Sequence, residues 1–363
     1  MNFIIDGHQD LAFESLAKKR DLTASVLTSR RNEPENVENQ VTLGWPEMKK
    51  GKIHLIFSTI FLEPPAQREH PKAIGINYET GEDFNRSVHF QIDFYNRLCE
   101  QHPEKFRLIT DQQSLTAQIE CGLSADTADP EDPNPIGLVL LLEGAEGLRA
   151  FEDLEEYYER GLRIVGPVWA GGRWCGGTFS PDSMRVTPEG RALLEKLAAQ
   201  RYILDISHMN TVSANEACDR YEGLVIASHS NCRALLHGQI NQRQLSDGTI
   251  ERLIERDGVM GVIPFNEFLD DSWTSGMQRE RVTLGTLAQH IDHICQLAGD
   301  ADHAAIGSDL DGGFGYPNIP LEMNDISDLP KLEHFLQQRG YTVEDIRKIF
   351  HENWMRVLQK GLP

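Results

Sequence analysis

The stretch IGLVLLLEG, residues 136–144, joins an unbroken apolar run to a carboxylate and a glycine. A short run that is apolar at every position, rather than at every second one, is typical of a strand in a parallel sheet covered on both faces. A carboxylate at the end of such a strand is costly to bury without a partner for its charge. The stretch therefore predicts a strand over 137–142 that ends in a site, where Glu143 meets either a metal ion or an arginine such as Arg149 or Arg163.

Similar apolar runs recur along the chain and alternate with segments of helical periodicity. Together with 137–142, the expected strands are 3–5, 53–61, 162–168, 202–206, 224–227, 258–263 and 304–306. The expected helices are 83–99, 188–200, 211–221, 247–256, 284–298 and 342–358. Eight strands separated by helices predict an α/β fold, a (β/α)8 TIM barrel, with an open doubly wound sheet as the alternative. We expect residues 1–363 to form a single barrel domain with long loops.

The charge balance argues against several classes of partner. The chain has 35 Lys and Arg residues against 56 Asp and Glu residues, a formal net charge of −21. A protein that binds nucleic-acid backbones needs a basic surface, and an acidic protein is repelled by anionic membranes. No run approaches the roughly 18 to 20 apolar residues of a membrane helix, and no signal peptide is visible. Six scattered cysteines without a C-x-x-C pair fit a reducing compartment. We therefore expect a cytoplasmic protein with no nucleic-acid or membrane partner, and an exposed acidic loop over 124–135.

Histidine, aspartate and glutamate, the residue types that commonly bind metals, follow five of the eight expected strands. They are His8 and Asp10 after the first strand, Glu143 after the third, His208 after the fifth, His229 after the sixth, and Asp309 with Asp311 after the eighth. In a barrel the carboxyl ends of the strands meet at one mouth, and imidazoles and carboxylates are ligands of divalent metals. Each residue alone has an ordinary explanation, such as a capped turn or a packed core histidine. Their recurrence at the same strand end predicts a metal centre at the C-terminal ends of the strands.

Other motifs do not predict chemistry. His290 and His293 lie three residues apart among apolar neighbours, which is typical of an ordinary amphipathic helix. No Gly-x-Ser-x-Gly elbow occurs, so serine nucleophile chemistry has no support.

The metal-binding motifs, in this order and spacing, resemble the membrane (renal) dipeptidase family, peptidase family M19, of the metallo-dependent hydrolase (amidohydrolase-like) superfamily. The resemblance covers essentially the whole chain. It implies two zinc ions per chain, with His8 and Asp10 on one, His208 and His229 on the other, and Glu143 bridging both. It further implies Asp309 as the catalytic acid/base and Arg243 as the group that binds the substrate carboxylate.

The chain departs from the family pattern at the expected fourth strand. Trp169 stands where the dipeptidases carry a substrate-polarising histidine, so we assign Trp169 to the substrate-binding set. Gln9 and Gln244 replace asparagines of the family motifs, which are milder changes.

The resemblance implies a zinc-dependent dipeptidase that hydrolyses the peptide bond of small dipeptides through a metal-bridging hydroxide. One alternative is a metal-dependent amidohydrolase that acts on an N-acyl amino acid or a lactam. A more distant alternative is a non-catalytic metal-binding barrel. Relatives in the family often form homodimers, but no feature of this sequence demonstrates an interface.

Overall fold

The computed structural model describes residues 3–34, 39–124, 134–236 and 242–363. Most of the acidic loop expected over 124–135 lies outside these residues. Among the described residues, no helix is both long and apolar enough to cross a lipid bilayer.

The expected strands all form, and they pair in parallel in the order β7-β6-β5-β4-β2-β1-β9-β8. A parallel bridge between Ala227 and Met260 connects the two ends of this order, so the ring is nearly closed. The barrel prediction is confirmed, and the open doubly wound sheet is wrong. The strands are β1 (Ile4–Gln9), β2 (Ile53–Phe61), β4 (Ile136–Glu143), β5 (Leu162–Gly166), β6 (Ile203–Asp205), β7 (Val225–Ile226), β8 (Met260–Val262) and β9 (Ala304–Ile306).

A ninth strand, β3 (Phe106–Leu108), pairs with the first residues of β4. The sequence pattern does not predict it, because three residues with an arginine in the middle are too short to show a periodicity.

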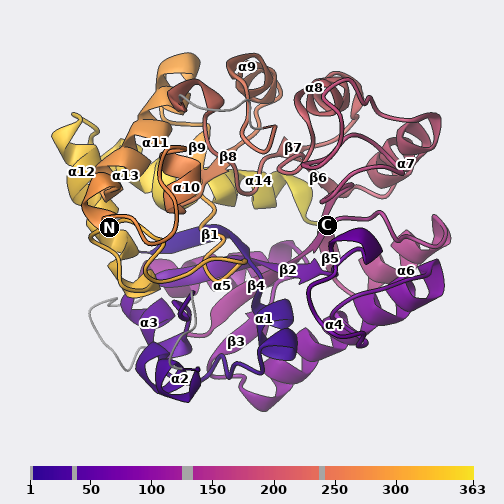
Figure 1. Cartoon of the computed structure of the whole chain (residues 1–363), viewed down its shortest axis with the longest axis horizontal. Helices are drawn as coiled ribbons and strands as arrows, with labels where there is room; N and C mark the ends of the chain where they lie inside the picture. Colours follow the sequence, from indigo (N-terminus) through magenta and orange to yellow (C-terminus); the bar gives the residue numbers. More distant parts are fainter. Residues whose placement is uncertain (1–2, 35–38, 125–133, 237–241) are drawn as a thin grey trace.

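Helices surround the strands in Figure 1. They are α1 (Leu11–Ala17), α2 (Val26–Asn32), α3 (Trp45–Lys50), α4 (Gly81–Gln101), α5 (Gln112–Ser124), α6 (Glu152–Glu159), α7 (Pro188–Ala199), α8 (Thr211–Arg220), α9 (Asp247–Glu255), α10 (Asn266–Leu269), α11 (Leu284–Ala298), α12 (Leu332–Gln338), α13 (Val343–Arg347) and α14 (Asn353–Gly361). The expected helix over 342–358 is divided, because a π-helical turn at Lys348–Glu352 separates α13 from α14.

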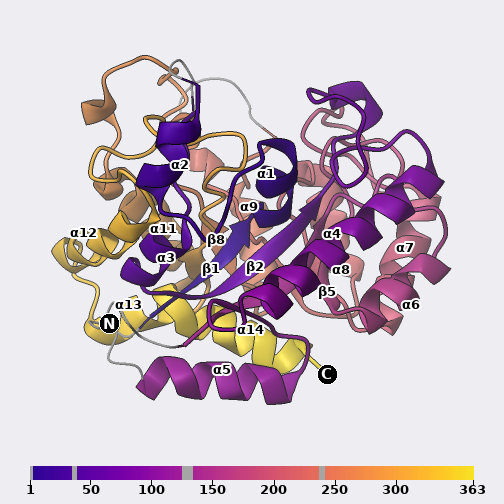
Figure 2. The same ribbon diagram turned by 90° about the horizontal axis from the view of Figure 1, so that it is seen from below.

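One end of the barrel is closed by α14, which lies beside α5 below the strands in Figure 2. Trp354 of α14 is fully buried, and its indole nitrogen donates to the carbonyl of Ile306 at 2.7 Å. The ring belongs to the same apolar cluster as Phe57 on β2 and as Val139 and Leu141 on β4. Side chains at alternate positions of each strand, such as Val139 and Leu141, fill the barrel interior, while the side chains between them face the helices.

His290 and His293 on α11 have separate partners, as expected for an ordinary amphipathic helix. Nδ1 of His290 accepts from the backbone nitrogen of Cys232 at 3.0 Å, and Nε2 of His293 lies 2.9 Å from Oδ1 of Asp247. His290 is fully buried, and burial lowers its pKa to about 4.

The buried neutral His290 makes stability depend on pH. The pKa of His290 is lower in the folded chain than the value of about 6.5 in the unfolded chain. The full free energy of unfolding is therefore present above pH 6.5, and the part that depends on neutral His290 is lost as the pH falls toward 4. Asparagine at this position keeps a hydrogen-bond acceptor but does not titrate. We therefore expect the free energy of unfolding to fall between pH 7 and pH 5 by roughly 2 kcal/mol less in His290→Asn than in wild type. Urea unfolding of both metal-free proteins at the two pH values measures this difference. Equal losses would contradict the assignment.

Candidate metal centre

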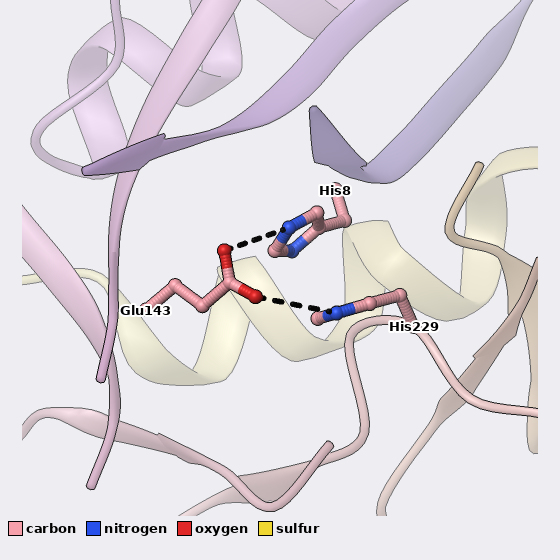
Figure 3. A group of neighbouring side chains, drawn as sticks. All are labelled: His8, Glu143 and His229. Atoms are coloured by element: carbon pink, nitrogen blue, oxygen red, sulfur yellow. Dashed lines mark ion pairs between the residues drawn. The ribbon is translucent and has the colours of Figure 1, made fainter. Parts of the chain in front are cut away.

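Glu143 ends β4 at the mouth of the barrel, and its two carboxylate oxygens face different imidazoles. It has the same parity as Val139 and Leu141, so the alternation that fills the barrel interior also turns this carboxylate inward. Its Oε2 lies 3.4 Å from Nε2 of His8. Figure 3 shows the carboxylate between His8 and His229.

The other oxygen of Glu143 serves two histidines. Its Oε1 lies 2.7 Å from Nε2 of His208 and 3.6 Å from Nε2 of His229. The two imidazole nitrogens are 3.0 Å apart. One carboxylate is therefore shared by His8 on one side and by the pair His208 and His229 on the other.

Neither Arg149 nor Arg163, the two arginines named as alternative partners, pairs with Glu143. Arg149 pairs with Glu82 and Asp153, and Arg163 donates to backbone carbonyls that include those of Thr110 and Tyr158.

His8 reaches Glu143 through an irregularity in β1. Phe3 and Ile5 belong to the cluster inside the barrel and Ile4 to the cluster outside it, so strict alternation would turn His8 outward. The pairing of β1 with β2 shifts register between Asp6 and Gln9. Such a bulge redirects side chains, and here it brings His8 into the barrel mouth.

Asp10 and Asp309 complete the second half of the cluster around His8. Oδ1 of Asp10 lies 3.9 Å, and Oδ1 of Asp309 lies 3.8 Å, from Nε2 of His8. Thr59, which points inward from β2, donates a short hydrogen bond to Asp10. Among the described residues, the buried groups that could hold a metal ion are His8 with Glu143 and His229, and His8 with Asp10 and Asp309.

The backbone of Asp309 adopts the left-handed region, with φ of 53°. Aspartate is one of the few residue types besides glycine that tolerate this conformation. The backbone nitrogen of Asp309 donates to the carbonyl of His8 at 3.0 Å, which holds the loop after β9 against β1.

Asp311 turns away from the cluster instead, and accepts from the backbone nitrogens of Thr42 and Leu43 at 2.8 and 3.1 Å. Asp311 therefore anchors a loop.

The tautomer of His229 follows from its neighbours. Ser228 Oγ donates its only proton to the carboxylate of Asp205, which can only accept. Nδ1 of His229 lies 2.7 Å from the same Oγ, so this nitrogen carries the proton and donates. Nε2 of His229 then presents a lone pair toward Glu143 and His208, which is the arrangement of a metal ligand. Nδ1 of His208 contacts Thr178 Oγ1 at 3.1 Å.

Burial controls the charge of the cluster. It lowers the pKa of His208 to about 4, and it also lowers the pKa values of His8 and His229. Burial and the charge of Glu143 raise the pKa of Asp10 to about 7. Burial, with the charges of Asp10 and Glu143, raises the pKa of Asp309 well above its ordinary value. A divalent cation would favour the ionised form of these carboxylates and could take the lone pairs of the neutral imidazoles.

The donor set fits a divalent metal ion. Nε2 of His8 is buried and has no hydrogen-bond partner within the described structure, although buried polar atoms are normally paired. Neutral imidazoles and carboxylates are the nitrogen and oxygen ligands that zinc and related ions take.

Two buried aspartates that sequence reasoning left without a role hold the ligand loops together. Asp205 accepts from the backbone nitrogens of Ser207 and Ser228 at 3.1 and 2.9 Å. Asp6 accepts from the backbone nitrogen of Ser308 at 2.7 Å and from Nε2 of Gln9 at 2.7 Å. The signal was present in the sequence, because each aspartate precedes a ligand histidine by two or three residues.

A set of glycines makes room for the peptide that positions His229. A Cβ added to Gly307, Gly261 or Gly7 would lie 1.9, 2.2 or 2.7 Å from the carbonyl oxygen of Ser228. Real Cβ atoms do not approach an oxygen this closely, so only glycine fits at these three positions.

Arg243 is buried beside the cluster and braces the same loops. Its Nη1 donates to the carbonyl of Ser207 and to Ser230 Oγ, both at 2.9 Å, and its Nη2 donates to the carbonyl of His229 at 2.9 Å. Its position at the site is as expected, and its predicted contact with a substrate carboxylate stays a prediction.

A cavity of about 830 Å³ opens above the cluster. Six of the eight expected site residues line it, namely Asp10, Glu143, Trp169, His208, Arg243 and Asp309, whereas His8 and His229 are buried and do not. The Trp169 ring lies 6.1 Å from the His208 ring, and its backbone nitrogen donates to Glu146 Oε1 at 2.8 Å. Several phenylalanines that sequence reasoning missed line the same cavity; none belongs to a recognisable motif.

Comparison with known proteins gives concordant matches. The family model described as membrane dipeptidase (peptidase family M19) matches residues 2–361. An uncharacterised protein in the pqqA 5′ region of Klebsiella pneumoniae is 31% identical over 66% of this chain and 87% of its own length. Dipeptidase aclJ of Aspergillus oryzae is 24% identical over 98% of this chain and 77% of its own. A metallo peptidase from Rhodobacter sphaeroides, crystallised with a phosphinate mimic of the dipeptide L-Ala-D-Ala, superposes with a TM-score of 0.77 at 22% identity, over 99% of both chains.

The shared carboxylate should set metal affinity. Saturating zinc, at about a thousand times its Kd, should stabilise the chelated wild type by roughly 4 kcal/mol. We expect Glu143→Gln to lose most of this gain without lowering the melting temperature of the metal-free protein, because the substitution removes a charge that repels Asp10. Thermal scans with and without Zn²⁺, with metal analysis by mass spectrometry, measure both effects. Glu104→Gln is the control, since that side chain is 61% exposed and should keep the full gain.

Crowding at the glycine set should also displace a metal ligand. Gly307→Ala forces the Ser228 carbonyl to move, so we expect a loss of stability of roughly 1–3 kcal/mol and a lower zinc content through the shifted His229. A Cβ at Gly248 would meet only the end of Arg252 at 3.7 Å, so Gly248→Ala serves as the matched control. Urea unfolding and bound zinc after dialysis are the measurements. A Gly307→Ala protein with wild-type stability and zinc content would contradict the steric account.

Proposed function

Because the chain belongs to the membrane dipeptidase family, peptidase family M19, we propose that it is a zinc-dependent dipeptidase that hydrolyses the peptide bond of small dipeptides. The observation that carries the proposal is the pair of buried metal-binding groups that share His8 and that place Asp10, Glu143 and Asp309 in the lining of one cavity. A relative named as a dipeptidase and the dipeptide mimic bound to a protein of the same fold support the substrate class.

In this proposal the ligands divide around Glu143. His8 and Asp10 would hold one zinc ion, His208 and His229 would hold the other, and Glu143 would serve both. Two ions bound there would supply an activated water and polarise the scissile carbonyl.

Asp309 moves the proton. Its carboxylate lines the cavity and lies within 4 Å of Nε2 of His8, so it reaches the reacting atoms without being the carboxylate that the two ion positions share. A cation at His8 favours its ionised form, which accepts a proton from the attacking water. Asp309 then delivers that proton to the leaving nitrogen, which departs as a neutral amine.

Arg243 orients the substrate. Its guanidinium is held by three hydrogen bonds to the ligand loops and lines the cavity, so a carboxylate that binds it is fixed relative to the metal ligands. Such a carboxylate is the C-terminal group of a dipeptide.

A second candidate follows from Trp169. An indole is a poorer donor to a developing oxyanion than the histidine of the family pattern. This departure favours a metal-dependent amidohydrolase that acts on an N-acyl amino acid or a lactam. In such an amidohydrolase, Glu143, Asp309 and Arg243 would keep the roles described above.

A substrate screen separates the two candidates. The zinc-loaded protein is assayed with L,L and L,D dipeptides, N-acyl amino acids and lactams, and its chelated form is the control. Dipeptide turnover that requires zinc supports the dipeptidase, and turnover of acylated compounds or lactams alone supports the amidohydrolase. No turnover of any compound contradicts both.

Removal of the proton carrier should separate metal binding from catalysis. We expect Asp309→Asn to bind wild-type amounts of zinc and to lose at least a hundredfold in kcat, because general acid–base groups typically contribute that much or more. Metal content and steady-state kinetics are the readouts. Wild-type turnover by the variant would show that another group carries the proton.

A further inference from the structure

Aromatic rings line the cavity in two groups. The first, which we call the Trp169 wall, consists of Phe61, Trp169 and Phe179, with ring centroids of neighbours 5.1 and 5.5 Å apart. The second, the Phe265 wall, consists of Phe265, Phe268 and Phe314 with centroids 4.9 and 4.4 Å apart.

The two walls stand on opposite sides of the barrel mouth. Phe61 ends β2 and Trp169 follows β5, which are the strands on either side of β4. Phe265 follows β8, which lies four places from β4 around the ring of eight strands. A substrate over the metal cluster therefore has one wall at each end.

The Phe265 wall lies on the side of the leaving amine. The guanidinium of Arg243 lies 5.6 Å from the centre of the Phe268 ring. Gly312, two residues before Phe314, lies next to the proton carrier, because a Cβ added there would lie 2.1 Å from Oδ1 of Asp309. Asp309, Gly312 and Phe314 also line the same cavity. Because Arg243 and Asp309 both act on the C-terminal part of a dipeptide under the proposed function, the acyl part extends toward the Trp169 wall.

The Trp169 wall is apolar surface that nothing in the described chain covers fully. Phe179 is 63% exposed, although its ring contacts that of Trp169, and both Trp169 and Phe61 are only half-buried. Contiguous exposed aromatic surface at the edge of a cavity marks a place where a ligand displaces water. A ring of the ligand that packs against such a wall adds to the affinity beyond the burial of apolar area.

We propose that the Trp169 wall is an acyl-side subsite that selects substrates whose N-terminal residue or acyl group carries an aromatic ring. This inference rests on the proposed function for the direction in which the substrate lies. It explains why a tryptophan replaces the polar residue of the family pattern, since a ring there extends the wall between Phe61 and Phe179.

The test compares matched dipeptides on the zinc-loaded protein. Trp-Ala, Ala-Trp and Ala-Ala are assayed for kcat/KM, and their Kd values are measured by calorimetry. We expect wild type to prefer Trp-Ala over Ala-Ala by about tenfold, which corresponds to the gain of one ring pair. Phe179→Ala should abolish most of this preference, and because Phe179 is largely exposed the variant should keep its fold. Leu27→Ala, at a residue 59% exposed on α2 outside the cavity, should keep the preference.

The outcomes separate this subsite from the proposed function. Hydrolysis of all three dipeptides at similar kcat/KM, or equal losses for Trp-Ala and Ala-Ala in Phe179→Ala, overturns the subsite and leaves the dipeptidase standing. If no dipeptide is hydrolysed, the dipeptidase fails and the Kd values decide. Tighter binding of Trp-Ala that disappears in Phe179→Ala supports the subsite, and equal binding overturns it.

Discussion

The rest of the site depends on the buried carboxylate of Glu143, which the barrel holds between imidazoles. Asp10 and Asp309 share the same pocket, and burial shifts their pKa values upward while it keeps His208 and His229 neutral. Such a set of crowded acids and lone pairs is unfavourable by itself. Divalent ions would offset this cost, because they would neutralise the carboxylates and accept the imidazole lone pairs.

Much of the surrounding structure serves to hold this set in place. Asp6 and Asp205 tie the loops after four strands to one another, and the glycines beside Ser228 let its peptide pass close to β8 and β9. Metal sites need such supporting contacts, because a ligand that rotates freely loses affinity. Arg243 adds to this bracing, so its guanidinium has a fixed position before any substrate arrives.

The fold and the meeting of the candidate ligands at one place were largely predictable, for a common reason. Apolar runs such as 137–142 read as buried parallel strands, and parallel strands in a barrel bring their carboxyl ends together. His8, Asp10, Glu143, His208, His229 and Asp309 therefore had to lie near one mouth, and they do. The short strand Phe106–Leu108 and the π turn at Lys348–Glu352 were not predictable, because neither shows a periodicity of its own.

The sequence by itself determined the class of fold, the acidic net charge of −21 and the chemistry of the strand ends. Tertiary structure alone decided which side chains point inward. His8 faces Glu143 because the β1–β2 register slips, and Asp311, two residues from Asp309, turns away to hold a loop. It also decided that rings far apart in the chain, such as Phe61 and Phe179, flank Trp169. The orientation of these side chains depends on strand bulges and on the order of the strands around the barrel. The local pattern of apolar and polar residues contains no information about either.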